Sequence, residues 1–274
     1  MTTLYYFTGT GNSLVVARQL AEELGGTDPV PIPQVMNSGE QVRAPPGPVG
    51  FVFPVYCAGL PRIVARFAEK VDLSDADYIF CACTLAESGM SGAFAELGSI
   101  LGRNHRSLDA GFGVFMPSNY VPGYEVPDAA AQEEYFRAAA RKVTEIAGAV
   151  KERKKGMETE KGWRVLLIRA AHPFFIRSLS GAGKKFYVQE TCSECTTCEK
   201  VCPTGNITMV EGRPVWHDAC EFCLACVNFC PKKCIQTGEK TERHGRYHHP
   251  DIAIRDMLGQ HGRKPDLSSL KNRT

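Results

Sequence analysis

The sequence predicts an α/β domain built on a doubly wound parallel sheet, followed by a small α+β domain rich in cysteine. The first half alternates short β-prone apolar runs with segments of helical periodicity, and repeated β-α units are typical of parallel sheets. Eight of the twelve cysteines lie within residues 192–230, in two copies of one pattern. We divide the chain into a first domain at residues 1–161 and a second domain at 188–240. A bridging segment, 162–187, joins them, and a basic tail follows at 241–274.

The elements expected in the first domain follow one another regularly. Apolar β-prone runs predict strands at 3–7, 49–55, 77–84 and 110–117, with a weak strand at 29–33. Helical spacing of apolar residues predicts helices at about 14–24, 61–71, 90–101 and 128–155, while the Pro- and Gly-rich stretch 34–48 is expected to replace a helix. Ligands of such sheets bind at the carboxyl ends of the strands, so the loops there are where we expect a site.

The first of these loops is rich in hydroxyl groups and glycine. The strand at 3–7 runs directly into Thr8-Gly9-Thr10-Gly11-Asn12-Ser13, and a helix follows. A loop so placed points N–H and hydroxyl groups at one spot beside a positive helix end, which suits a phosphate. It matches neither G-x-x-x-x-G-K-[ST] nor G-x-G-x-x-G and has no lysine, which disfavours ATP and dinucleotides and favours a single phosphate monoester. An ordinary strand-to-helix turn is the alternative.

This loop resembles the T-x-T-G-N-[ST] loop of flavodoxins, which holds the phosphate of FMN. The resemblance implies FMN as a cofactor, with Tyr56 against the isoalloxazine ring and backbone groups near Thr84 to Gly89 on its polar edge. Tyr56 could equally be a loop aromatic packed on the domain. The segment 116–120, after the fifth strand, is expected to close the pocket. The predicted cofactor-binding residues are Thr8, Gly9, Thr10, Gly11, Asn12, Ser13, Pro54, Val55, Tyr56, Cys57, Thr84, Leu85, Ala86, Gly89, Asn119 and Tyr120.

The second half carries C-x2-C-x2-C-x3-C-P twice. Three thiolates this closely spaced can hold three corners of one iron–sulfur cube, and in the bacterial two-cluster arrangement the fourth cysteine of each run ligates the other cluster. We therefore predict two [4Fe–4S] clusters. One is assigned to Cys192, Cys195, Cys198 and Cys230, and the other to Cys220, Cys223, Cys226 and Cys202. Zinc sites are the alternative, but they usually pair two C-x2-4-C knuckles across a spacer. A disulfide framework would ignore the duplicated register.

The remaining cysteines are expected to be reduced. Cys57, Cys81 and Cys83 lie in or beside apolar runs and are most simply core or pocket thiols, while Cys234 is expected to be a spare thiol and not a ligand. The N-terminus shows neither a basic leader nor an apolar run typical of a signal peptide. The apolar stretch 163–178 is too short to span a membrane and contains three arginines. We therefore expect a reduced, cytoplasmic chain.

Charge gives a weaker indication of partners. The net charge of +2 does not argue for nucleic acid as a partner. The cysteine-rich region is locally acidic, which could steer a basic partner or could be a merely solvated surface. Its acidic residues are Glu190, Glu194, Glu199, Glu211, Asp218 and Glu221. In the tail, His248 and His249 are expected to form a surface pair and not a metal site, and the last stretch to Thr274 is expected to be disordered.

The order of these segments resembles the fused flavodoxin–ferredoxin proteins of anaerobic bacteria and archaea, often called EFR-type ferredoxins. The resemblance covers nearly the entire chain, and it implies a flavodoxin-like domain joined to a two-[4Fe–4S] ferredoxin-like domain. It also implies electron transfer between the clusters, FMN and redox partner proteins. One alternative is an FMN-dependent reductase of a small substrate, fed by the clusters. Only Glu87 and Tyr120 are candidate acids for it, and no catalytic residue is assigned. A redox-sensing binding module is a further alternative.

Overall fold

A computed structural model describes residues 1–26, 28–160, 163–179 and 181–261. Its first part holds one sheet of parallel strands in the order β2-β1-β3-β4-β5-β6. The strands are β1 (Thr3–Tyr6), β2 (Val30–Pro31), β3 (Gly47–Pro54), β4 (Ala76–Leu85), β5 (Ala110–Phe115) and β6 (Gly156–Met157). This is the flavodoxin-like order 2-1-3-4-5 with one further edge strand, so the predicted α/β class and parallel sheet are confirmed.

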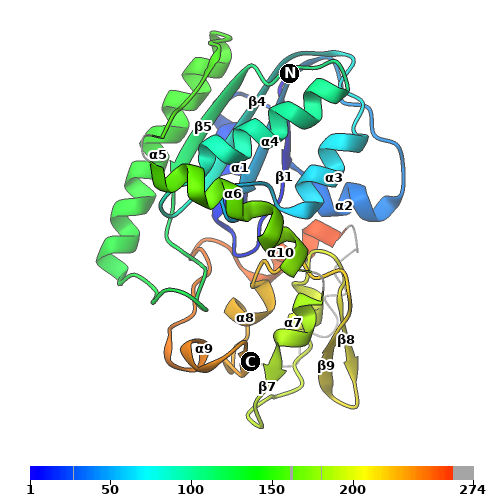
Figure 1. The fold of residues 1–274 in the computed structure, drawn as a ribbon, viewed down its shortest axis with the longest axis vertical. Helices are drawn as coiled ribbons and strands as arrows, with labels where there is room; N and C mark the ends of the chain where they lie inside the picture. The colour runs from blue at the N-terminus through cyan, green and yellow to red at the C-terminus, as the bar shows by residue number, and fades with distance from the viewer. Residues whose placement is uncertain (27, 161–162, 180, 262–274) are drawn as a thin grey trace.

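Helices cover both faces of the sheet (Figure 1). Two of them, α1 (Asn12–Glu23) and α5 (Ala129–Lys151), pack on one face. The other face carries α2 (Ile32–Ser38), α3 (Arg62–Lys70) and α4 (Met90–Arg103). Because both faces are covered, the central strand β3 is an almost continuous apolar run, in which Phe51 and Phe53 are fully buried.

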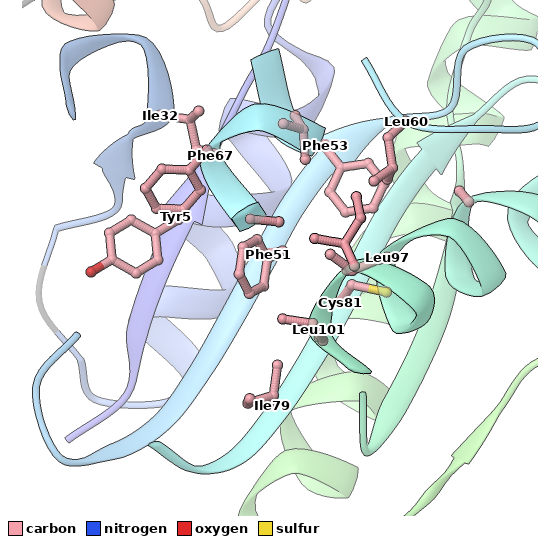
Figure 2. Packing of buried hydrophobic residues seen from close by; sticks show 14 of the residues in the cluster. Tyr5, Ile32, Phe51, Phe53, Leu60, Phe67, Ile79, Cys81, Leu97 and Leu101 are labelled. Atoms are coloured by element: carbon pink, nitrogen blue, oxygen red, sulfur yellow. The ribbon is translucent and has the colours of Figure 1, made fainter. Parts of the chain in front are cut away.

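The core under α3 is aromatic. Figure 2 shows the rings of Tyr5, Phe51 and Phe67 gathered between sheet and helix, with the centroids of Tyr5 and Phe67 4.8 Å apart. Rings at such distances add about 0.5–1.5 kcal/mol per pair to the apolar area that they bury. This core holds β1, β3 and α3 together, and it therefore positions the loops that leave the carboxyl ends of the strands.

Two expectations for the first domain are wrong. The stretch 34–48 was expected to lack a helix, yet α2 covers Ile32–Ser38. Pro33 lies in its first turn, where the missing N–H has no helical partner in any case, and Gly39, at φ 72°, ends it. The helix expected to reach about residue 155 ends at Lys151, and the chain then forms the short edge strand β6.

The cysteine-rich part is small and mixed in structure, as expected for an α+β unit. The segment leading to it forms α6 (Trp163–Ser178) and η1 (Ala182–Lys185). Two antiparallel pairs follow, β7 (Tyr187–Val188) with β10 (Ile235–Gln236) and β8 (Ile207–Val210) with β9 (Arg213–Trp216). The short helices are α7 (Thr197–Lys200), α8 (Ala225–Asn228) and α9 (Glu239–Arg243). In the described ranges, no helix combines the length and the hydropathy that crossing a membrane requires.

The tail returns to the first domain. After α9 the chain runs back between the two parts of the molecule and forms α10 (Ile254–Leu258) and η2 (Gly259–His261) (Figure 1). Tyr247, Ile252 and Met257 are almost completely buried, and the last two join the core of α1 and α5. The sequence predicts a basic tail at 241–274, and the structure adds that residues 247–260 of this tail pack on the first domain. Residues 262–274, which were expected to be disordered, lie outside the described residues.

Candidate functional site

Two cavities in the cysteine-rich part are each lined by four of the eight motif cysteines. The first cluster cavity, as we call it, is lined by Cys192, Cys195, Cys198 and Cys230. The second cluster cavity is lined by Cys220, Cys223, Cys226 and Cys202. Each cavity thus receives three cysteines from one run and the fourth from the other, which is the grouping that the motif spacing predicts.

The backbone of each run turns in the same way. Glu194 and Thr196 have φ of 55° and 62°, and Phe222 and Leu224, which are their counterparts in the second run, have φ of 53° and 60°. These left-handed residues alternate with the cysteines and turn the chain around each cavity. A short helix then begins after Thr196 and after Leu224, which places the third cysteine of each run in a helical turn.

N–H groups surround the second cluster cavity. The Asn206 N–H donates to Cys202 Sγ at 3.2 Å, and the Phe222 N–H donates to Cys220 Sγ at 3.4 Å. Two further donors that line this cavity, Trp216 Nε1 and Asn206 Nδ2, are buried and have no acceptor among the described residues. Donors of this kind suit the sulfur atoms of an iron–sulfur cluster, whose potential depends on such hydrogen bonds. The four thiols and the set of donors therefore fit a four-thiolate cluster.

Burial keeps several of these thiols neutral in the absence of a cation. It raises the pKa of Cys198 to about 12 and that of Cys220 to about 11. Metal ligation requires the thiolate, so loading these cavities with iron would release protons and stabilise the fold around them. Within the described part of the chain, no three His, Cys, Asp or Glu side chains lie close enough together to hold a single metal ion.

Cys234 lies in the first cluster cavity. It was expected to be a spare thiol, but its Sγ is 3.4 Å from Cys230 Sγ and its side chain lines the cavity. Three residues separate the two cysteines, and the turn that begins at Pro231 brings them together. The other thiols match expectation, since Cys81 and Cys83 are fully buried in the sheet core and Cys57 is half-buried in the loop after β3.

The hydroxyl-rich loop 8–13 lies between β1 and α1, as predicted. Gly11, at φ 101°, precedes the helix, and its N–H donates to Thr8 Oγ1 at 3.0 Å. The structure brings the loop together with other predicted residues. Ser13 Oγ lies 2.8 Å from Thr84 Oγ1, and Asn119 Nδ2 donates to Thr10 Oγ1 at 3.0 Å.

The same loop is covered by the tail. The His249 N–H donates to the Thr10 carbonyl at 2.8 Å, and the Thr8 N–H donates to Gln260 Oε1 at 3.3 Å. The Tyr247 hydroxyl donates to Asn12 Oδ1 at 2.7 Å. Thr8, Thr10 and Ser13 are consequently about 1% exposed. In this arrangement the groups that were predicted to hold a phosphate contact the chain itself.

The loops predicted to flank the flavin ring contact each other. A Cβ on Gly89 would lie 2.7 Å from the Cα of Ala58, so the loop after β4 lies directly on the loop after β3. The Gly89 N–H is taken by the Glu160 carboxylate, at 2.8 and 3.0 Å from its two oxygens. Tyr56 packs edge-on against Phe7. This agrees with the alternative that Tyr56 is a loop aromatic packed on the domain. FMN therefore does not fit at this edge in the arrangement seen here, and its contacts remain a prediction.

An ion-pair cluster joins the second cysteine run to α3. Glu221 is 2% exposed, and its carboxylate lies 3.0 Å from Arg66 Nη2 and 3.9 Å from Arg62 Nε. It also accepts from the Ile63 N–H at 3.2 Å. Burial raises the pKa of Glu221, and the two arginines oppose that rise. Glu221 was expected on an acidic surface and is instead an interdomain residue. Four others, Glu190, Glu194, Glu211 and Asp218, are exposed, and Glu199 is half-buried.

The two tail histidines differ in their surroundings. His248 is exposed and stacks on Phe229, with centroids 4.4 Å apart. His249 is 3% exposed and packs on Phe136 at 4.5 Å, so the expectation of a surface pair is wrong for His249. Their rings contact different partners, Phe229 and Phe136.

Comparisons with known proteins add a likeness to a solved structure. No protein-family model and no curated protein matches the chain. Among solved structures, it is similar to a crystal structure described as a "Putative flavoprotein from Bacteroides uniformis ATCC 8492". The sequence identity is 18%, the match covers 42% of this chain and 89% of the other, and the TM-score is 0.34. The fold assignment accordingly rests on the strand order itself.

Proposed function

We propose that this chain is an electron-transfer protein that carries two [4Fe–4S] clusters with crossed fourth ligands. The observation that carries the proposal is that each of two cavities is lined by four of the eight motif cysteines, three from one run and one from the other. When bound, each cluster supplies a one-electron redox couple. The crossing also ties the two runs to each other, so loading either cavity would stabilise both runs.

The protein's own residues would set the properties of each centre. The second cluster cavity faces the first domain, since the carbonyl of Cys220 accepts from Arg62 and the carbonyl of Cys223 lies against Gly9. Cys192 and Cys195, on the first cluster cavity, are partly exposed. We assign to the first cavity the exchange of electrons with redox partner proteins, and the acidic residues Glu190 and Glu194 beside it favour a basic partner surface.

The proposal includes FMN binding only for an arrangement in which the 8–13 loop is not covered by the tail. The loop resembles a flavin phosphate loop, and the strand order places it at the switch point between β1 and β3 where FMN binds in flavodoxin-like sheets. A relay between clusters and FMN therefore requires that the tail move. The reductase alternative has less support, because its candidate acids Glu87 and Tyr120 are both exposed.

A reductive titration tests the proposal. The anaerobically purified chain should take up about two electrons, one per cluster, with reversible bleaching of its visible absorbance. Cys195→Ser should halve the reversible uptake by removing a ligand of the first cavity. Cys57→Ser is the matched control, since Cys57 is also half-buried but lines neither cavity. A chain that takes up no electrons reversibly, or a Cys57→Ser variant that loses as much as Cys195→Ser, contradicts the proposal.

A further inference from the structure

We propose that residues 247–260, here called the closing segment, compete with FMN for the 8–13 loop, so that FMN binds only when the closing segment has left it. This inference deepens the flavin part of the proposed function and does not depend on the clusters. The loop would then have two states. In one state it binds the tail and the docked cysteine-rich part, and in the other it binds FMN.

The closing segment occupies one hydrogen-bond donor of the loop, the Thr8 N–H, and donates to two of the loop's acceptors. The Gln260 side chain accepts from the Thr8 N–H. The His249 N–H donates to the Thr10 carbonyl, and the Tyr247 hydroxyl donates to Asn12. A phosphate bound at a helix N-terminus takes up backbone N–H and hydroxyl donors of such a loop. The Thr8 N–H cannot serve both acceptors at once.

Space at the loop is also taken. A Cβ on Gly11 would lie 2.8 Å from the side chain of Ile252 and 3.1 Å from that of His249. A Cβ on Gly9, the other glycine of the loop, would lie 2.4 Å from the Cys223 carbonyl oxygen. Gly11 is thus in contact with the closing segment, and Gly9 is in contact with the second cysteine run.

The closing segment is anchored at both ends. Near its start, the Tyr247 N–H donates to Asn228 Oδ1 at 3.0 Å, and Asn228 Nδ2 donates to the Asn119 carbonyl at 3.2 Å. Near its end, Asp256 pairs with Arg18 of α1 at 2.8 Å, and Met257 is fully buried. Because Asn228 lies in α8 of the cysteine-rich part, release of the segment would loosen the docking of that part as well.

The competition has a measurable consequence. A ligand whose binding-competent state is only partly populated binds with an apparent Kd raised by the reciprocal of that population. The wild-type chain should therefore bind FMN weakly, and changes that detach the closing segment without touching the loop should strengthen binding. Addition of FMN should in turn expose the segment.

The test compares two detaching variants with a matched control, all in the full-length chain with its iron content measured. Ile252→Glu places a charge against Gly11, and Asp256→Arg places a like charge against Arg18. Arg243→Glu is the control, because Arg243 is 80% exposed and pairs with Glu239 of its own helix. FMN and riboflavin are titrated anaerobically by flavin fluorescence, and amide exchange is followed in residues 8–13 and 247–260.

We expect Ile252→Glu to strengthen FMN binding by about tenfold or more, Asp256→Arg to do so by less, and Arg243→Glu to have no effect. Riboflavin, which has no phosphate, should gain little. If Ile252→Glu does not fold, Asp256→Arg, which changes a half-buried side chain and not a fully buried one, still decides the test. The proposal is overturned if FMN binds the wild type while residues 247–260 stay protected, or if a variant exposes this segment and FMN affinity is unchanged. A chain without iron would instead contradict the proposed function.

Discussion

A methyl group added to Gly9 would lie 2.4 Å from the carbonyl oxygen of Cys223. Gly9 belongs to the loop after the first strand, and Cys223 is a predicted ligand of the second cluster. No real Cβ could occupy that position without displacing the second cysteine run. The two predicted cofactor sites of the chain are therefore in direct backbone contact.

Gly9→Ala should loosen this contact. We expect it to lower the free energy of unfolding by about 1–3 kcal/mol, as overpacking of a close contact does. Gly98→Ala is the matched control, since Gly98 lies in α4 and a Cβ there would meet no described atom within 4 Å. That control should be neutral or stabilise the helix by about 0.5–1 kcal/mol. Denaturant unfolding of the iron-loaded chain measures both, and equal effects at the two positions would rule out the close contact.

The crossing of the fourth ligands predicts unequal effects of two alanine variants. Cys202→Ala should damage the cluster held by Cys220, Cys223 and Cys226, because its thiol lines their cavity. Cys230→Ala should retain more of the other cluster, since Cys234 Sγ lies 3.4 Å from Cys230 Sγ and can take its place. Iron content and EPR spectra of the two variants, with Cys230→Ala/Cys234→Ala alongside, check this. Selective loss of the cluster in the run that carries the mutation would contradict the crossing.

Trp216→Phe should lower the reduction potential of the second cluster. The indole N–H is buried without an acceptor in the described part of the chain and lines the cavity with Cys226. An N–H that points at a cluster stabilises its more negative, reduced state, so loss of the donor favours the oxidised state. A hydrogen bond worth about 1 kcal/mol corresponds to roughly 43 mV in a one-electron couple. An EPR-monitored redox titration measures the shift, with the first cluster as the internal control; a raised or unchanged potential would count against this donor.

The Glu221 carboxylate should contribute to docking far more than exposed acidic groups do. Glu221→Ala removes the partner of Arg66 and of the Ile63 N–H in a buried site, and we expect a loss of about 1.5–3 kcal/mol. Glu190→Ala is the control, because that side chain is 98% exposed although it pairs with Arg213. Such surface pairs contribute about 0–1 kcal/mol. Thermal unfolding at matched iron loading distinguishes the two, and similar losses would mean that Glu221 does not hold the interface.

His172 of α6 should make the docking of that helix sensitive to pH. Burial lowers the pKa of His172, but the adjacent Glu96 and the carbonyls of Tyr56 and Cys57 outweigh burial and raise it above its usual 6.5. Its Nε2 is 3.1 Å from Glu96 Oε2, and its Nδ1 is 3.0 Å from the Tyr56 carbonyl. A raised pKa in the folded state means that this stabilisation is complete below pH 6.5 and is lost as the pH rises through the raised pKa.

The measurement is the difference in unfolding free energy between the wild type and His172→Gln, followed from about pH 6 to about pH 8.5. We expect the difference to shrink as the pH rises. His105→Gln is the control, since His105 lies in an exposed turn after α4. A difference for His172 that stays constant over this range would show that the ion pair with Glu96 does not stabilise the fold.

Local sequence patterns predicted those helices, strands and cysteine groups that residues close together in the sequence form. The alternation of apolar runs and helices predicted β1, β3, β4 and β5, and the spacing of the cysteines predicted the grouping around the two cavities. In contrast, the burial of Ile252 depends on a surface formed by Gly11 and α1, which lie far earlier in the chain, and no local period reveals it. The contact between Glu160 and the Gly89 N–H is likewise a long-range pairing of a surface-type residue with a loop amide.

The most direct test of the central claim is a metal and sulfide analysis of the anaerobically purified chain, combined with its EPR spectrum after reduction. Two crossed [4Fe–4S] clusters predict about eight iron and eight acid-labile sulfide per chain, with signals of two reduced clusters close enough to interact magnetically. About two zinc per chain, without sulfide and without an EPR signal on reduction, would contradict it.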